Sequence, residues 1–185
     1  MINQQVELPW LLEIGNSPLV AVALHDGHAV REEVAASLAL PKHERFREED
    51  PFTRIWTVVA DTRIVGLRSR FEVDFNRPRE QAVYRSPEEA WGLQVWKSPP
   101  SPEMIERSLA QYDAFYAEVQ RVFTRLQRRF GRFVVFDLHS YNHRREKQNA
   151  PPADTATHPE VNVGTSSLNR DLWAPLLDRF IKDLR

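Results

Sequence analysis

Two histidines stand directly after short apolar runs that are typical of buried β-strands. Residues 18–24 form the first run and lead into His25, and residues 132–138 form the second and lead into His139. Because ligands in α/β sheets collect outside the carboxyl ends of the strands, both imidazoles are candidate metal ligands. The chain has no cysteine, so a zinc site would use histidine and carboxylate alone, as catalytic zinc sites commonly do. Asp137 is expected to accept a hydrogen bond from a ligand imidazole.

The third metal ligand is expected in an acidic cluster at residues 47–50, which read Arg-Glu-Glu-Asp. Zinc in hydrolases commonly takes three protein ligands and leaves one position for water. Asp50 also has the type and place of a helix N-cap, so Glu49 is the favoured ligand and Asp50 the close alternative. His28 is near enough in sequence to replace His25. The competing interpretation is that these histidines are ordinary loop residues.

A second polar cluster, in residues 69–77, has the chemistry of a site for a small acid. Arg70 and Arg77 can each present a planar set of donors to a carboxylate, and Asn76 adds an amide donor. The competing interpretation is an arginine pair in solvent, with Asp74 as its ion-pair partner. The cluster suits a small acidic substrate.

The elements that must position these residues alternate between strands and helices. Strands are predicted over residues 18–24, 63–67, 69–75 and 132–138, and helices over 30–40, 51–60, 101–131 and 168–184. The stretch 78–102, rich in proline and tryptophan, is expected to form a long loop. This order predicts an α/β fold with a mixed, largely parallel sheet and helices on both faces, in a single domain over residues 1–185.

Composition limits the classes of partner. The 185 residues carry a net charge of −1, so neither a nucleic acid nor a membrane surface is expected as a partner. An arginine run at residues 121–132 lies among acidic residues of the same predicted helix and indicates a solvated face. No stretch approaches the roughly 20 apolar residues of a membrane span, and the start of the chain lacks the pattern of a signal sequence. A cytoplasmic location is therefore expected.

The chemistry-bearing segments resemble, in order, motifs of the N-formylglutamate amidohydrolase family. Leu24-His25-Asp26-Gly27 resembles its His-x-Gly turn, and Glu49-Asp50-Pro51-Phe52-Thr53 resembles its acidic motif. Residues 69–78 are similar to its Ser-Arg…Asp-x-Asn-Arg-Pro signature. Asp137-Leu138-His139-Ser140 and Asn162-Val163-Gly164-Thr165 are similar to its later Asp-x-His-Ser and Gly-Thr motifs. The resemblance extends from about residue 18 to residue 165.

This resemblance implies a zinc-carboxypeptidase-like fold in which His25, His139 and an acidic residue at Glu49 or Asp50 hold Zn²⁺. It implies hydrolysis of a small N-acyl acidic amino acid, with N-formyl-L-glutamate giving glutamate and formate. A metallo-carboxypeptidase, a deacylase for another substrate and a non-catalytic metal- or ligand-binding domain are the alternatives.

The resemblance also implies roles for the second cluster. Arg70 would stabilise charge that develops on the substrate carbonyl, while Asn76 and Arg77, similar to the Asn-Arg pair of zinc carboxypeptidases, would hold the substrate carboxylate. Members of the family usually extend further, and zinc carboxypeptidases use a late glutamate as general base, so a chain that stops at Arg185 is expected to be truncated. The expected base is then the acidic residue that does not bind metal: Glu48, Glu49 or Asp50.

Overall fold

The computed structural model describes residues 8–144, 149–165 and 168–184. These residues form two compact units, one that runs to Tyr141 and one that begins at Asn142. The first unit contains the sheet and helices α1 to α3, and the second contains α4 (Arg170–Asp183), which the apolar pattern of the terminal residues predicted.

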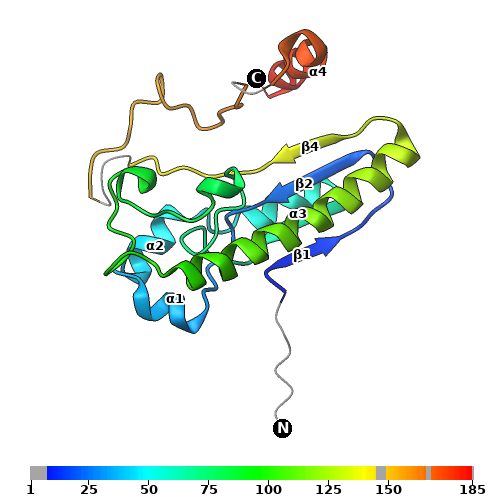
Figure 1. The fold of residues 1–185 in the computed structure, drawn as a ribbon. Coiled ribbons are helices and arrows are strands. Elements are labelled where there is room, and N and C mark those ends of the chain that lie inside the picture. The colour runs from blue at the N-terminus through cyan, green and yellow to red at the C-terminus, as the bar shows by residue number, and fades with distance from the viewer. Residues whose placement is uncertain (1–7, 145–148, 166–167, 185) are drawn as a thin grey trace. The chain divides into compact units, whose positions relative to one another are not determined.

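A four-stranded mixed sheet forms the centre of the first unit (Figure 1). Its strands are β1 (Trp10–Glu13), β2 (Leu19–Ala23), β3 (Thr62–Gly66) and β4 (Val134–Asp137), in the spatial order β1-β3-β2-β4. The central strand β2 runs parallel to both β3 and β4, while β1 at the edge is antiparallel to β3. The predicted α/β class with a mixed, largely parallel sheet is therefore confirmed.

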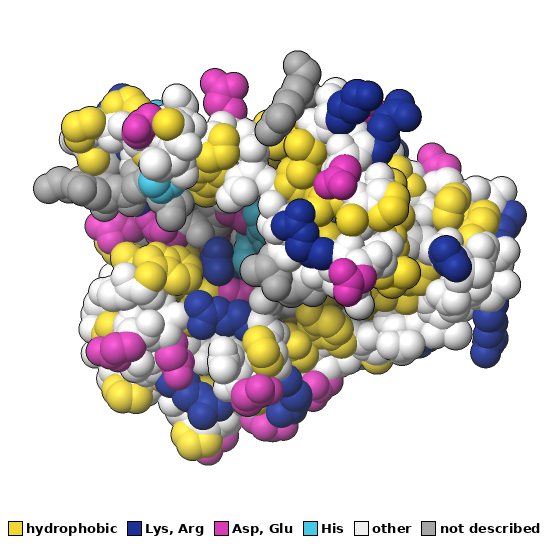
Figure 2. Space-filling view, turned by 90° about the horizontal axis from the view of Figure 1, so that it is seen from above, with side chains coloured by type: hydrophobic (Ala, Val, Ile, Leu, Met, Phe, Trp, Pro, Cys, Tyr) yellow, Lys and Arg dark blue, Asp and Glu magenta, His cyan; other side chains and the backbone are white. Residues whose placement is uncertain are grey.

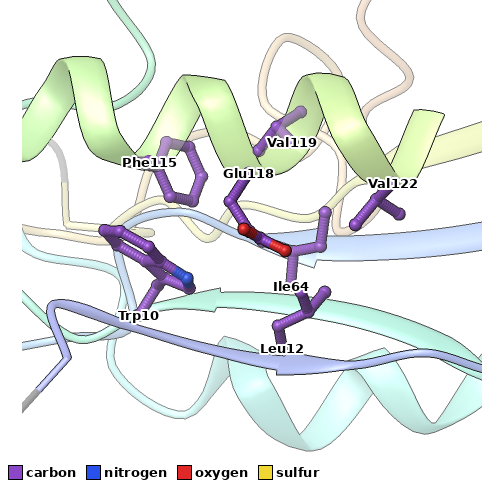
Figure 3. Close-up of a pocket in the computed structure, with 7 residues that line it drawn as sticks. All are labelled: Trp10, Leu12, Ile64, Phe115, Glu118, Val119 and Val122. Carbon is purple, nitrogen blue, oxygen red and sulfur yellow. The ribbon is translucent and has the colours of Figure 1, made fainter. Parts of the chain in front are cut away.

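The long helix α3 (Pro102–Phe130) covers one face of the sheet, as Figure 1 shows. Ser101 caps its first turn by accepting a hydrogen bond from the backbone N–H of Met104, and Gly131 ends it at a φ of 73°. Figure 3 shows the apolar side chains that meet between helix and sheet: Trp10, Leu12, Ile64, Phe115, Val119 and Val122. Because alternate residues of a strand point to opposite faces, Leu11 and Val65 face the other way. There they line a groove of about 290 Å³ with residues of the short 3₁₀ helix η1 (Thr53–Val59).

Two short helices follow β2 along the chain. They are α1 (Glu32–Ser37), within the predicted helix 30–40, and α2 (Lys42–Glu48), which was not predicted because its sequence is almost wholly charged. The predicted helix over residues 51–60 is instead the 3₁₀ helix η1, and its supposed core residues Phe52, Ile55, Trp56 and Val59 are exposed. Their periodic spacing therefore did not indicate burial.

The predicted strand over residues 69–75 is wrong. The segment is a series of turns, because the carbonyl of Ser69 accepts hydrogen bonds from the N–H groups of both Glu72 and Val73. The alternation also misled about burial, since Glu72 and Asp74, assigned to a polar face, are as buried as Val73. The buried charges are compensated by ion pairs, of Glu72 with Arg31 and of Asp74 with Arg70.

Charges of both signs are mixed on the face of the protein that is drawn in Figure 2. Figure 2 shows Lys and Arg side chains interspersed with Asp and Glu on the face in view, consistent with the net charge of −1. Among the described residues, none of the helices combines the length and the apolar character that crossing a membrane requires.

Candidate metal and substrate site

The carboxyl ends of the parallel strands converge at the candidate site. His25 comes two residues after β2 and His139 two residues after β4, and the two strands are held in register there because Leu138 N–H donates to the carbonyl of Val22. The imidazole ring centroids lie 4.9 Å apart. The sheet thus brings together two histidines that are far apart in sequence.

Both histidines face the same carboxylate, that of Asp50. Nδ1 of His25 lies 3.3 Å from Asp50 Oδ2, and Nδ1 of His139 lies 2.7 Å from the same oxygen. One ligand atom from each of the three residues lies within 4.8 Å of the other two, so the group could hold a metal ion. Two ligands at roughly 2.1 Å from a tetrahedral ion are about 3.4 Å apart, which is close to the His25–Asp50 separation. The His139–Asp50 distance of 2.7 Å is shorter, so these two side chains would move apart by about 0.7 Å when a metal ion binds. The donor set therefore fits a metal ion.

The opposite ring nitrogens of both histidines are occupied by further carboxylates. Nε2 of His25 lies 2.7 Å from Asp74 Oδ1, which is completely buried, and Nε2 of His139 lies 3.0 Å from Asp137 Oδ1. The second contact is the one that the sequence predicted. A carboxylate on the remote nitrogen fixes the tautomer of a ligand imidazole and raises its basicity. Both histidines are thus arranged with Nδ1 towards Asp50.

The same contacts set the protonation of this group. Burial would raise the pKa of Asp50, but hydrogen bonds with His139 and His25 hold it well below its usual range. Burial would lower the pKa of His139, but Asp137 and Asp50 together raise it to about 9. The pKa of Asp74 is also well below its usual range despite burial, because it pairs with His25. A metal ion that binds here at neutral pH must displace a proton from His139.

The backbone between β2 and η1 places Asp50 beside the strand ends. Asp50 N–H donates to the carbonyl of His25 at 3.0 Å, and the hydroxyl of Thr53 donates to the carbonyl of Asp50 at 2.8 Å. Gly27 lies so close to the next strand exit that an added Cβ would meet the backbone carbon of Leu67 at 2.1 Å. Only glycine allows this close approach, which explains the His-x-Gly spacing.

Glu49, the ligand favoured from the sequence, lies outside the His25–Asp50–His139 group. Its side chain points to a separate cluster, where Oε2 lies 2.5 Å from Nδ1 of His28 and Oε1 accepts a hydrogen bond from Ser69. Arg45, one turn earlier on α2, lies 3.8 Å from the same carboxylate. The neighbouring residues Glu49 and Asp50 thus belong to two different clusters. Glu49 was favoured because Asp50 was expected to cap a helix, but Phe52 occupies the cap position of η1, so Asp50 is free of that role.

The arginines of the second cluster gather around Asp74. Nη2 of Arg70 lies 3.0 Å from Asp74 Oδ2, and Nε of Arg77 lies 3.7 Å from the same oxygen. Burial would lower the pKa of Arg70, but Asp74 and, more weakly, Asp50 raise it. The competing interpretation, an ion pair with Asp74, is therefore correct for the pairing, but the arginines are not solvated: their side chains are 17% and 26% exposed. Asp74 links both arginines to the His25–Asp50–His139 group, because its other oxygen contacts His25.

Asn76 and Tyr84 complete the site. The Asn76 amide nitrogen lies 3.2 Å from Nε2 of His139, and its backbone N–H donates to Asp74 Oδ1. Tyr84, completely buried in the predicted loop 78–102, donates its hydroxyl to Asp74 and carries the Arg77 guanidinium 4.5 Å above its ring. Burial and the charge of Asp74 raise the pKa of this tyrosine well above its usual range. The sequence offered no sign of the role of Tyr84, whereas Asp74 stands within the 69–78 motif.

The comparison with protein families gives a match to the model for N-formylglutamate amidohydrolase over residues 17–185. The chain belongs to this family. A crystal structure of an N-formylglutamate amidohydrolase from Ralstonia eutropha JMP134 has a similar fold, with a TM-score of 0.61 at 16% sequence identity. The match covers 79% of this chain and 63% of that one, so the chain spans less than two thirds of the solved relative. A search of curated proteins finds no match.

Proposed function

We propose that this protein is a zinc-dependent amidohydrolase of N-acyl acidic amino acids, with N-formyl-L-glutamate as the substrate. The observation that carries the proposal is the His25–Asp50–His139 group, in which both Nδ1 atoms face one carboxylate while further carboxylates hold both Nε2 atoms. Two histidines and one carboxylate are a ligand set of catalytic zinc, which leaves a position for water or substrate. Membership of the family supports the choice of amide.

The arginine cluster provides the polar contacts that an acidic substrate requires. When bound, zinc would act as a Lewis acid on the amide carbonyl and make water a stronger nucleophile near neutral pH. Arg70 uses Nε and Nη2 for Tyr84 and Asp74, and its Nη1 has no hydrogen-bond partner among the described residues. This donor would bind an oxygen atom of the acidic substrate in the ground state as well as when charge develops on the carbonyl oxygen. Arg77 and Asn76 would hold the substrate carboxylate and so orient the amide.

Of the three acidic residues considered for the base, Asp50 is assigned to the metal and Glu48 pairs with Arg47, which leaves Glu49 for proton transfer. Its side chain is 1% exposed, whereas that of its partner His28 is 34% exposed. Because the buried carboxylate is shielded from solvent, His28 would exchange protons with the reacting groups while Glu49 holds its tautomer. The variant His28→Asn should lower kcat with little effect on KM. An unchanged kcat would exclude this route.

The first test is the zinc content of the purified protein together with formate release from N-formyl-L-glutamate. Wild type, His139→Ala and the control His43→Ala are compared, because the side chain of His43 is 75% exposed and lies outside the group. About one zinc per chain in wild type and in the control, lost together with formate release in His139→Ala, is the expected result.

Two outcomes would contradict the proposal. If the wild type takes up no zinc after incubation with the metal, the proposed zinc site is refuted. If zinc-loaded protein releases no formate, the proposed activity is refuted. Release of amino acids from peptides in place of formate would identify a metallo-carboxypeptidase.

A further inference from the structure

Trp91 occupies an unusual position beside the arginine cluster. Its backbone adopts a left-handed conformation with a φ of 44°, which is rare for a bulky residue and persists only where the surroundings enforce it. The side chain is nevertheless 46% exposed, so burial alone does not account for this conformation. Residues with strained backbone conformations cluster at active sites and ligand-binding positions.

The ring of Trp91 forms one wall around the Arg70 guanidinium. The Arg70 Cζ atom lies 4.9 Å from the centroid of the tryptophan ring, within the range of a cation–π contact. Nε and Nη2 of Arg70 point to Tyr84 and Asp74 on other sides. The rings of Tyr84 and Trp91 meet nearly at right angles, at 83° and a centroid distance of 5.8 Å. Arg70 is therefore held by three neighbours, with Nη1 left for a ligand.

The contact between Trp91 and Arg70 also bears on the His25–Asp50–His139 group. Arg70 Nη2 lies 3.0 Å from one oxygen of Asp74, and the other oxygen of Asp74 lies 2.7 Å from Nε2 of His25, so a single carboxylate joins the guanidinium to a candidate metal ligand. A shift of Arg70 would thus change both its own donor direction and the charge near the candidate ligands. Only Trp91, among the three neighbours, contacts Arg70 without a hydrogen bond and at the protein surface.

We propose that Trp91 is a positioning residue of the substrate site, which holds Arg70 in the orientation that binds the anionic substrate. The inference rests on the proposed function, because it assigns Arg70 to the same acidic substrate. It predicts that loss of the aromatic face weakens binding of an acidic ligand more than it changes the rate of the chemical step.

The test measures binding of L-glutamate to the zinc-loaded full chain by calorimetry, and KM and kcat for N-formyl-L-glutamate. Trp91→Leu keeps apolar bulk but removes the π face, and Trp91→Phe keeps a ring. Trp56→Leu is the matched control, because Trp56 is 48% exposed and has no aromatic or cation contact among the described residues. Thermal unfolding of each variant verifies the fold.

We expect Trp91→Leu to raise the Kd for L-glutamate and the KM by about 2- to 30-fold, at nearly constant kcat, which is the range of a cation–π contact. Trp91→Phe should retain most of the affinity and Trp56→Leu all of it. Equal affinity in wild type and Trp91→Leu, or equal losses in the two leucine variants, would overturn the inference. So would wild type that fails to bind L-glutamate. Absence of formate release with binding that still depends on Trp91 would refute the proposed activity alone.

Discussion

The replacement Asp74→Asn tests how strongly the buried carboxylate supports the metal group. Asp74 Oδ1 lies 2.7 Å from His25 Nε2, while Oδ2 accepts hydrogen bonds from Tyr84 and Arg70. Asparagine keeps one acceptor oxygen and places an NH₂ group at the other position. The variant can therefore serve the histidine or the Tyr84–Arg70 side, but not both.

The expected loss follows from the role of such a partner. Removing a carboxylate that orients a ligand histidine typically weakens metal binding 10- to 100-fold, which is about 1.4 to 2.7 kcal/mol. The matched control is Asp137→Asn, because Asp137 contacts His139 in the same way at 3.0 Å but its side chain is 44% exposed. Water can replace the lost acceptor there, so the control should lose less than about threefold.

Competition with a chromophoric zinc chelator at fixed pH measures both affinities. The apo forms are also compared by thermal unfolding, because Asp74 carries buried ion pairs whose loss lowers stability as well. Zinc affinity in Asp74→Asn that matches wild type would refute the reasoning. A larger loss in the exposed control than in the buried variant would refute the argument from burial.

Three further outcomes are expected from the same geometry. The pKa of His139 is raised to about 9 in the metal-free protein, so a proton must leave when zinc binds. Zinc affinity, measured by chelator competition, should therefore rise with pH by up to about tenfold per unit between pH 6 and 8. A constant affinity over this range would contradict the prediction. Gly27→Ala should lower zinc uptake and the unfolding temperature, because its Cβ would meet Leu67 backbone at 2.1 Å; an unchanged unfolding temperature would show that the loop yields. Arg77→Met should raise KM about 10-fold or more at similar kcat, from loss of a charged hydrogen bond, whereas the control Arg79→Met, whose native side chain pairs with Asp113, should not; equal KM values would exclude Arg77 from carboxylate binding.

The parallel strands could be predicted from their apolar sequence, although only β2 is buried as expected along nearly its whole length. The residues of β4, at the edge of the sheet, alternate between half-buried and exposed. β2 and β4 are continuous apolar runs that end at histidines, and α3 has a cap, a regular apolar spacing and a glycine stop. Each of these signals is local in sequence. The edge strand β1 was missed, because only four residues pair there and its sequence does not alternate between apolar and polar.

The site was only partly predictable, because its decisive contacts join distant segments. The sequence placed His25 and His139 at strand ends, but it could not distinguish Glu49 from Asp50, since adjacent residues differ only in the direction of their side chains. The alternation over residues 69–75 predicted a strand, yet Asp74 turns inward to reach His25. A buried carboxylate that pairs with a distant imidazole leaves no periodic signal.

Two tyrosines of α3 anchor the backbone of the segment that contains Arg77. Tyr112 and Tyr116 donate their hydroxyls to the backbone carbonyls of Arg77 and Phe75, at 2.8 and 2.6 Å. Residues 69–78, which are proposed to bind the substrate, form no helix or strand, so their backbone depends on anchors from the helix. Local unfolding of α3 around Tyr112 and Tyr116 will therefore free the backbone at Arg77. Because such coupling is reciprocal, a ligand that binds Arg77 will slow hydrogen exchange of the amides around these two tyrosines.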